Sequence, residues 1–475
     1  MYKEQIDAFI DSKKEEMLAD LSALVSINSI RGEAQPGMPY GEGPAKVLDK
    51  MGELMRRYGL SVTDYDHYAV TGDFSEKEKE LDILAHLDVV PVTEDWTVTQ
   101  PFTPLIKDGR IYGRGTSDDK GPAVAALYAV RAIKELGIPL KKSVRLICGS
   151  DEECGSSDLE HYYSIEKEAP CTFTPDADFP MINLEKARLA KPFACKVPGK
   201  QEGAALLSFV SGDKVNVVPG KAEMVIRAVK AEDAAAAAAK VQESTGAVFT
   251  VSEDAPSGGI RVLVKGTAAH AATPQEGNSA LTAGMTFVAE LAGCGLLAGD
   301  PAAEAIVRLL KIFPHGDTSG KASGIAMSDE VSGALTQNLG ILCYDREAGT
   351  LSGQYDMRAP LCANDDNLTA VIDRCLKEAL FTPEEGKMKP AHYVPADSSF
   401  VQTLLGSYER YFGKKGTPLY TGGGTYVHEL ERGVAFGCMI EGVDNHMHGD
   451  DEFMEISTLL ISAKIFADVI VKLCG

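Results

Sequence analysis

VRLICGSDEECGSSD, residues 144–158, joins an apolar run to three consecutive acidic residues. The apolar part is typical of a strand that is buried on both faces, and it ends at Gly149. Asp151, Glu152 and Glu153 then lie together where the strand ends. Because crowded carboxylates repel one another, the pattern predicts that a positive group lies among them.

Helical and strand-like segments alternate on both sides of this stretch. Residues 3–25 and 43–58 have apolar residues at helical spacing, and residues 81–90 form a second buried strand-like run. Residues 123–136 are again helical in pattern and end at Gly137. This order predicts an α/β domain with a mainly parallel central sheet.

The pattern changes after Glu185, where strand–helix–strand segments recur in two runs of similar size. From about residue 390 the first pattern returns. At 475 residues the chain is also too long for one ordinary core. We therefore predict an α/β domain of residues 1–184 and 390–475, with an α+β domain of residues 185–389 inserted into it.

Composition limits the partners of the protein. A formal charge of −22 argues against binding to nucleic acid or to anionic membrane surfaces. No run of eighteen apolar residues is present, and the first residues lack the features of a signal peptide. The ten cysteines include no C-x-x-C pair, which is typical of reduced thiols, so we expect a cytoplasmic protein.

Metal-binding types of side chain recur where apolar segments end. Taken singly, each has an ordinary reading as a structural histidine, a helix N-cap or a solvated acid. Their recurrence instead favours a divalent metal held by carboxylate oxygens and imidazole nitrogens. The sequence lacks a zincin helix, a Walker loop and a nucleophile elbow, and the Gly-rich TGGGT (421–425) has no Walker lysine. The candidate ligands are His86, Asp88, Asp118, Asp119, Glu152, Glu153, Asp176, Asp178, His446 and His448.

Several of these motifs, in this order, resemble the co-catalytic zinc peptidases, a family that includes aminoacylases, carnosinases and acetylornithine deacetylase. The similar stretches are HLDVVP, GRGTSDDKGP, GSDEE, PDA, a C-terminal His-x-x-x-Glu and KGTAAHAATPQEGNSA. VNVVPG and TGGGTY resemble the bacterial Xaa-His dipeptidase branch most. The resemblance implies a catalytic di-metal domain and an inserted, doubled ferredoxin-like lid domain.

The resemblance also implies two Zn²⁺ ions per chain, with Mn²⁺ or Co²⁺ as alternatives. Asp118 would bridge the ions, and His448 is preferred to His446 because Glu452 keeps the family's spacing. Each ion would have two further ligands, and the full set is His86, Asp118, Glu153, Asp176 and His448.

Three catalytic roles follow from the same resemblance. Asp88 would orient His86, Glu152 would be the general base, and His270 of the lid would stabilise the oxyanion. The substrate would be held by Asn216, Arg358 and the loop residues Gly423, Gly424 and Thr425. One departure is His428, which stands where the dipeptidase branch tends to have arginine.

The resemblance therefore implies a monomeric dipeptidase that acts on small, unblocked peptides. Two alternatives remain at this point. One is a deacylase of N-acyl amino acids that uses the same metal centre, and the other is a metal-dependent binding protein without catalytic activity. The sequence assigns no role to Asp151.

Overall fold

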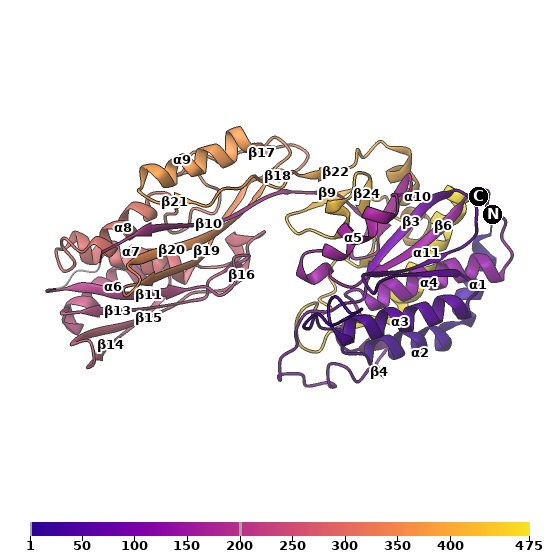
Figure 1. Ribbon diagram of the computed structural model, residues 1–475, viewed down its shortest axis with the longest axis horizontal. Coiled ribbons are helices and arrows are strands. Elements are labelled where there is room, and N and C mark those ends of the chain that lie inside the picture. Colours follow the sequence, from indigo (N-terminus) through magenta and orange to yellow (C-terminus); the bar gives the residue numbers. More distant parts are fainter. Residues whose placement is uncertain (1, 199–201) are drawn as a thin grey trace. The chain divides into compact units, whose positions relative to one another are not determined.

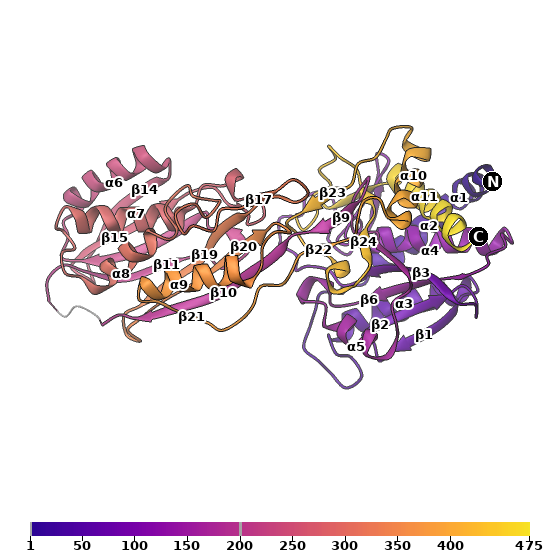
Figure 2. The same cartoon turned by 90° about the horizontal axis from the view of Figure 1, so that it is seen from above.

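The computed structural model describes residues 2–198 and 202–475, which form two compact units (Figures 1 and 2). Unit 1 contains the residues up to Glu185 together with His392–Tyr420 and Gly424–Gly475. Unit 2 contains Lys186–Ala391 and the short segment Thr421–Gly423, which lies in the part of the sequence predicted to belong to the first domain.

Unit 1 is built on a sheet with the order β1–β2–β6–β3–β7–β24–β9–β22. The four central strands β6, β3, β7 and β24 are parallel, as expected for strands made of continuous apolar runs. The strands at both edges are antiparallel. The bounds are β1 (Ser61–Tyr65), β2 (Ala69–Asp73), β3 (Lys79–His86), β6 (Ser143–Gly149), β7 (Cys171–Thr174), β9 (Ile182–Glu185), β22 (His392–Tyr393) and β24 (Gly433–Ala435).

Smaller strands of unit 1 lie outside this order. A three-stranded sheet joins β26 (Phe453–Glu455) to β5 (Arg110–Tyr112) and β4 (Leu105–Lys107). It therefore ties the region that follows His448 to the region that precedes Asp118. The other strands are β8 (Ala177–Asp178), β23 (Leu419–Thr421) and β25 (Cys438–Met439).

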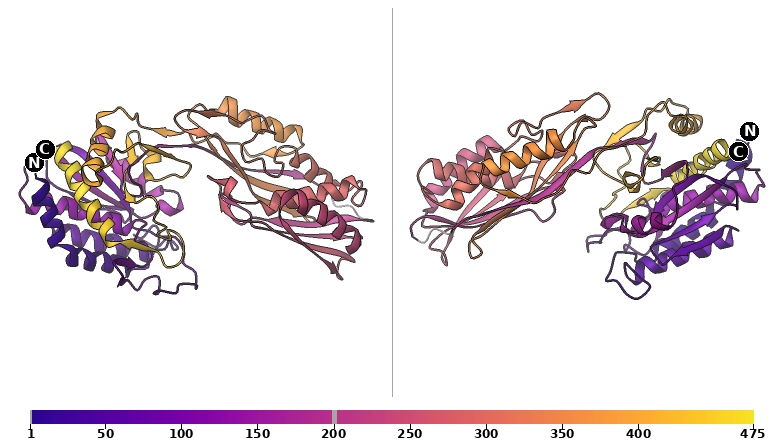
Figure 3. Two further views of the ribbon diagram at one scale, coloured as in Figure 1. Left: turned by 180° about the vertical axis from the view of Figure 1, so that it is seen from behind. Right: turned by 45° about the horizontal axis from the view of Figure 1, so that its top comes forward.

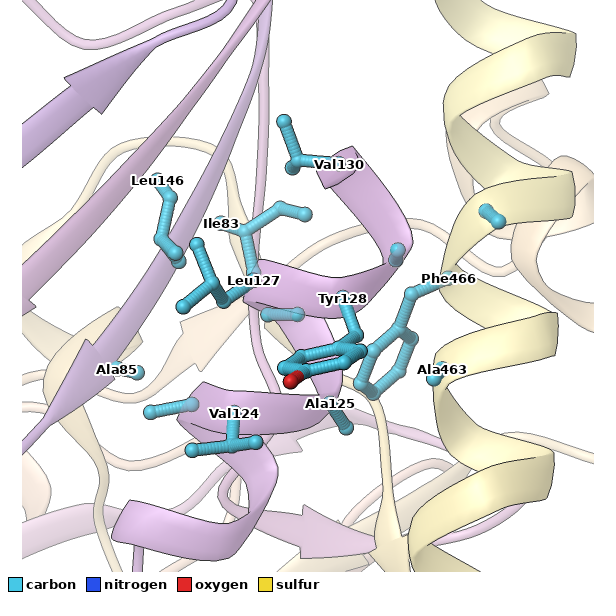
Figure 4. Packing of buried hydrophobic residues seen from close by; sticks show 14 of the residues in the cluster. Ile83, Ala85, Val124, Ala125, Leu127, Tyr128, Val130, Leu146, Ala463 and Phe466 are labelled. Atoms are coloured by element: carbon cyan, nitrogen blue, oxygen red, sulfur yellow. The ribbon is translucent and has the colours of Figure 1, made fainter. Parts of the chain in front are cut away.

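Helices pack on the unit 1 sheet, and the most buried of them is α4, in which every residue from Lys120 to Ile133 is buried. Figure 4 shows Leu127 of α4 beside Ile83 and Leu146 of the sheet, and Tyr128 beside Phe466 of α11. The helices are α1 (Lys3–Ser12), α2 (Lys14–Val25), α3 (Glu42–Arg57), α4 (Lys120–Glu135), α5 (Ser157–Ile165), α10 (Ser399–Phe412) and α11 (Ile456–Cys474).

The segment 3–25, predicted as one helical run, consists of two helices that meet at Lys13. The backbone of Lys13 departs from helical geometry, with φ −99° and ψ 6°. Ile6 and Ile10 before this turn and Met17 and Leu21 after it are all buried, so both helices contribute to one core. Apolar spacing alone does not show the turn, because the periodicity continues across it.

Unit 2 is the α+β domain that the sequence predicts. Its main sheet is antiparallel throughout, in the order β14–β15–β13–β11–β19–β20–β10–β21. Burial alternates along β10, and the buried Lys191 bonds to Asp373 of α9, so the helices cover one face of this sheet (Figure 3). The strands are β10 (Ala187–Lys196), β11 (Ala205–Ser211), β13 (Lys221–Arg227), β14 (Val248–Asp254), β15 (Gly259–Lys265), β19 (Thr336–Asp345), β20 (Thr350–Ala359) and β21 (Thr382–Pro383).

The helices of unit 2 are α6 (Ala231–Thr245), α7 (Ala280–Gly293), α8 (Pro301–Leu310) and α9 (Ala370–Glu378). Two short pairs stand apart from the main sheet, namely β12 (Val217–Val218) with β16 (Ala269–His270), and β17 (Ser328–Asp329) with β18 (Gly333–Ala334). Among the described residues, no helix combines the length and apolarity needed to cross a bilayer.

We expect Phe466→Ala to destabilise unit 1 by about 3–5 kcal/mol, because a fully buried ring that contacts Phe173 would leave a cavity. Ile165→Ala is the control, since Ile165 is 58% exposed and its truncation should change stability by less than about 0.5 kcal/mol. Thermal and urea denaturation followed by circular dichroism measure both changes. Equal stability of the two variants would show that α11 is not part of this core.

Candidate metal centre

The acidic turn after β6 is held by a neighbouring strand end. Residues Glu152–Cys154 form a single 3₁₀ turn. The carboxylate of Asp88 accepts the backbone N–H of Glu152 at 3.2 Å and that of Glu153 at 3.1 Å. Asp88 therefore fixes the backbone of both glutamates at once, and their side chains leave from adjacent positions on a fixed turn.

His86 ends β3 and lies in the interior of unit 1. Its Nδ1 is 3.1 Å from the Asp88 carbonyl oxygen and 3.4 Å from the Asp88 carboxylate. Both of these groups accept hydrogen bonds, so Nδ1 carries a proton. Its Nε2 is 2.9 Å from Asp118 Oδ1 and 3.8 Å from Asp176 Oδ2. The ring thus presents Nε2 to two carboxylates, as a metal-binding histidine does.

The second oxygen of Asp118 faces another histidine. Asp118 Oδ2 is 2.7 Å from His448 Nε2, which is itself 3.3 Å from Glu153 Oε1. Two groups of possible ligands result, and Asp118 belongs to both. Within each group the ligand atoms lie within 4.8 Å of one another. The groups are His86, Asp118 and Asp176, and Asp118, Glu153 and His448.

These residues fit a pair of divalent ions by distance and by chemistry. Ligands of a tetrahedral zinc ion lie about 3.4 Å apart when each is about 2.1 Å from the metal. The His–carboxylate distances of 2.7–3.8 Å surround that value. Glu153 Oε1 is buried, and His448 Nε2 lies 3.3 Å from it. One imidazole and two carboxylates per group suit zinc, manganese or cobalt.

The carboxylates of the site lie where burial opposes their charge. Burial raises the pKa of Glu152 well above its usual range, and the nearby Asp176, Glu153 and Asp118 raise it further. Burial together with Asp118 also raises the pKa of Asp176 to about 7. Burial likewise raises the pKa of Glu153. A cation bound among these groups would offset the cost of ionising them.

The pKa values of the two histidines are raised as well, which for an imidazole favours the charged form. Hydrogen bonds to Asp118 and Glu153 raise the pKa of His448 to about 11. Burial alone would lower the pKa of His86, but Asp118 and Asp88 hold it well above its usual value. Burial would raise the pKa of Asp118, and the hydrogen bonds from His448 and His86 instead hold it below its usual range.

A buried ion pair anchors the loop that carries Asp118. Glu452 is fully buried and accepts hydrogen bonds from Arg114 Nη1 at 2.6 Å and from the backbone N–H of Ser117 at 2.9 Å. The backbone N–H groups of Gly115 and Asp118 also point to it. The sequence indicated Glu452 only as a guide to choosing between the histidines and did not single out Arg114, although the GRG motif that contains it is separated from the Asp-Asp pair by only two residues.

The remaining candidate ligands lie outside the two groups. His446 Nδ1 is 3.0 Å from the Asp450 carbonyl oxygen. Asp119 is fully buried, and its Oδ2 accepts the backbone N–H of His86 at 3.1 Å. Asp178 is exposed at the end of β8. Asp119 therefore supports a ligand instead of adding one.

Three residues predicted to act on the substrate lie in unit 2. Asn216 precedes β12, and its carbonyl oxygen accepts the N–H of Ala271, which follows His270. Arg358 in β20 donates to both oxygens of Asp356, at 2.8 and 3.0 Å, and to the carbonyl oxygen of Gly422. The structure thus gives Arg358 internal partners, and its role toward a substrate stays a prediction.

The Gly-rich segment is held by an acid that the sequence did not single out. Glu185, buried at the end of β9, accepts the N–H of Thr425 at 3.1 Å and its hydroxyl at 2.7 Å. The second oxygen of Glu185 is 2.9 Å from Nδ1 of His428, the residue at which the chain departs from the dipeptidase pattern. Gly423 donates its N–H to the hydroxyl of Thr421 at 2.9 Å. His428 therefore helps to hold this segment.

Comparison with known families and sequences gives matches over most or nearly all of the chain. Residues 83–472 match Peptidase family M20/M25/M40. A Bacillus subtilis (strain 168) protein named "Putative dipeptidase YtjP" is 36% identical over 465 residues, which cover 97% of this chain and 98% of that protein. "Putative dipeptidase SAB1611c" of Staphylococcus aureus (strain bovine RF122 / ET3-1) is 31% identical, over 100% of this chain and 99% of that protein.

Two solved structures share the fold. Human carnosine dipeptidase 1 has a TM-score of 0.60 and 14% identity, with 100% of this chain and 99% of that chain covered. The aminoacylhistidine dipeptidase from Vibrio alginolyticus has a TM-score of 0.55 and 14% identity, with 97% and 96% covered.

We expect metal binding near pH 7 to release protons, because His448 with a pKa of about 11 and His86 with a raised pKa are protonated in the metal-free chain. As the pH falls, Asp176 also takes up protons around pH 7, so the affinity for metal should fall further. Zn²⁺ titration calorimetry in buffers of different ionisation enthalpy counts the protons.

The two nearby histidines provide matched variants for this measurement. His448→Gln should lower both the affinity and the number of released protons, whereas His446→Gln should behave as the wild type does. The reverse result would make His446 the ligand.

Proposed function

Because the chain belongs to Peptidase family M20/M25/M40 and is a metallopeptidase, we propose that it hydrolyses unblocked dipeptides. The observation that carries this proposal is the carboxylate of Asp118, which gives one oxygen to each of two His–carboxylate groups. The dipeptidase names of relatives that match over nearly their whole length support the choice of substrate.

We assign two metal ions to the two groups around Asp118, with zinc as the first choice and manganese or cobalt as alternatives. When bound, such a pair polarises the scissile carbonyl and lowers the pKa of a water molecule. The chain's own part is to hold the ligand atoms in place. His86 and Asp176 would hold one ion, Glu153 and His448 would hold the other, and Asp118 would contribute to both groups.

Glu152 is the proposed general base. Its backbone is fixed through Asp88, beside Glu153, but its carboxylate belongs to neither ligand group. The raised pKa of Glu152 suits a group that accepts a proton from the attacking water and then donates it to the leaving amine. Asp88 is the proposed orienting partner of His86, because its oxygens accept the hydrogen bond from Nδ1–H of His86.

Residues of unit 2 and the Gly-rich segment complete the proposal. His270 is assigned to stabilising the oxyanion, a task for which loss of one donor costs about two to three orders of magnitude in rate. Arg358 is assigned to the C-terminal carboxylate of the dipeptide, and Asn216, Gly423, Gly424 and Thr425 to the rest of the substrate. A monomeric state and a cytoplasmic location are further parts of the proposal.

A substrate panel tests the proposed function directly. Purified protein loaded with Zn²⁺, Mn²⁺ or Co²⁺ is assayed on unblocked dipeptides and on N-acetyl amino acids. We expect hydrolysis of the dipeptides. Hydrolysis of the acylated compounds alone would identify a deacylase, and no hydrolysis of either set would favour a binding protein.

We expect Glu152→Gln to lower kcat by about 10²–10⁴-fold, because glutamine cannot accept the proton of the attacking water. Zn²⁺ binding should persist, since Glu152 lies outside both ligand groups. Glu160→Gln is the matched control, because Glu160 is exposed on the nearby helix α5 and should leave kcat unchanged. Wild-type activity in Glu152→Gln would show that another group moves the proton.

A further inference from the structure

The segment Leu24–Arg31, for which no functional role was predicted, contacts three of the turns that carry candidate ligands. Ser29 donates its hydroxyl to the carbonyl oxygen of Leu87 at 2.7 Å and accepts the N–H of Val89 at 3.4 Å. These two residues flank Asp88. The segment is thus bonded to the chain on both sides of the residue that fixes the two glutamates.

The same segment is bonded to the Asp-Asp turn through a buried lysine. Lys120 Nζ donates to the carbonyl oxygens of Leu24 at 3.1 Å and Ile27 at 2.9 Å. Lys120 is fully buried and begins α4 directly after Asp119. Because a buried amine without hydrogen-bond partners is costly, these carbonyl oxygens fix the start of α4 relative to the segment.

Arg31 forms the third connection, to the acidic turn itself. Its Nη1 contacts Oδ1 of the fully buried Asp151 and donates to the carbonyl oxygen of Cys154 at 3.3 Å. Asp151 Oδ2 accepts the hydroxyl of Ser157 at 2.5 Å, and the Asp151 carbonyl oxygen accepts the N–H of Ser156 at 2.8 Å. Arg31 therefore bonds to both residues that flank Glu152 and Glu153.

We infer that Arg31 is a positioning residue, which sets the place of Glu152 and Glu153 by holding the turn from Asp151 to Cys154 from outside. The inference rests on the proposed function, in which Glu152 moves the proton and Glu153 binds metal. Without Arg31 the buried carboxylate of Asp151 loses its cation, and the turn is free to shift toward water. A displacement of about 1 Å at such a site can cost about 10²-fold in rate.

The test compares Arg31→Gln with Arg57→Gln. Arg57 is a matched control, because it is also a partly exposed arginine paired with a buried aspartate, Asp20, at 3.2 Å. Asp20 belongs to a network with Tyr58 and Tyr128 and to neither ligand group. We expect Arg31→Gln to lower kcat at least about tenfold with little change in KM, and Arg57→Gln to leave kcat unchanged.

The conservative variant gives a rescue. The bonds from Arg31 to Asp151 and to Cys154 both come from the nitrogen Nη1, so the point charge of lysine can replace them. Arg31→Lys should therefore recover most of the lost kcat. A purely structural role would instead lower the melting temperature of Arg31→Gln and Arg57→Gln alike, without a selective effect on kcat.

Amide hydrogen exchange gives a readout that does not depend on activity. Peptides that cover residues 150–158 should exchange faster in Arg31→Gln than in Arg57→Gln or wild type. Faster exchange together with the selective loss of kcat supports the inference. Unchanged exchange, or unchanged kcat in an enzyme that needs Glu152, overturns it.

A failure of the proposed function is recognised separately. It shows as a wild type that hydrolyses no dipeptide, or as full activity of Glu152→Gln. Zn²⁺ affinity then replaces kcat as the second readout, because Glu153 lies on the same turn. An affinity equal to that of Arg57→Gln overturns the inference in that case as well.

Discussion

The repulsion among the buried carboxylates around Asp118 is the constraint on which unit 1 is built. Asp118, Asp176, Glu152 and Glu153 lie close together with two imidazoles, and burial raises the pKa of the last three. Left to themselves, such groups would separate or take up protons. The fold must therefore hold them by contacts that do not depend on their own charges.

A second set of buried carboxylates provides these contacts. Glu452 binds the backbone N–H groups of the Asp118 loop, Asp119 binds that of His86, and Asp88 binds those of Glu152 and Glu153. Each of these acids lies on one ligand-bearing loop and binds the backbone of another. The loops are thus linked in series, by charge-assisted bonds that are stronger than bonds between neutral groups.

This linkage explains why the sequence could give the site only in part. Residue types alone indicated ten candidate ligands, because an acid that binds metal and an acid that binds a backbone N–H look the same in a sequence. The family resemblance selected five of the ten. It could not show that Asp119 supports His86 or that Asp151 needs Arg31, because those contacts join segments that are 33 and 120 residues apart.

The strands of the central sheet were easier to predict from the sequence than these contacts between loops. The strands β3 and β6 are continuous apolar runs that are buried on both faces, so composition alone indicates them and their parallel pairing. β24, however, has only three residues, and it pairs with β7 from more than 250 positions further along the chain. Local pattern carries little information about such a strand, because its place is decided by the tertiary core.

The adjacent Glu152 and Glu153 depend both on the local geometry of their turn and on contacts from distant parts of the chain. Side chains that follow one another on a fixed turn diverge, so Glu153 can reach His448 while Glu152 stays outside the ligand groups. That separation requires the backbone of the turn to be fixed more firmly than either side chain. The carboxylate of Asp88 accepts the backbone N–H groups of Glu152 and Glu153 and so holds the turn from one side, and Asp151 holds it from the other side through Arg31. Under the proposed function, the three consecutive acids therefore have different roles: Asp151 anchors the turn, Glu152 would move a proton, and Glu153 would bind metal.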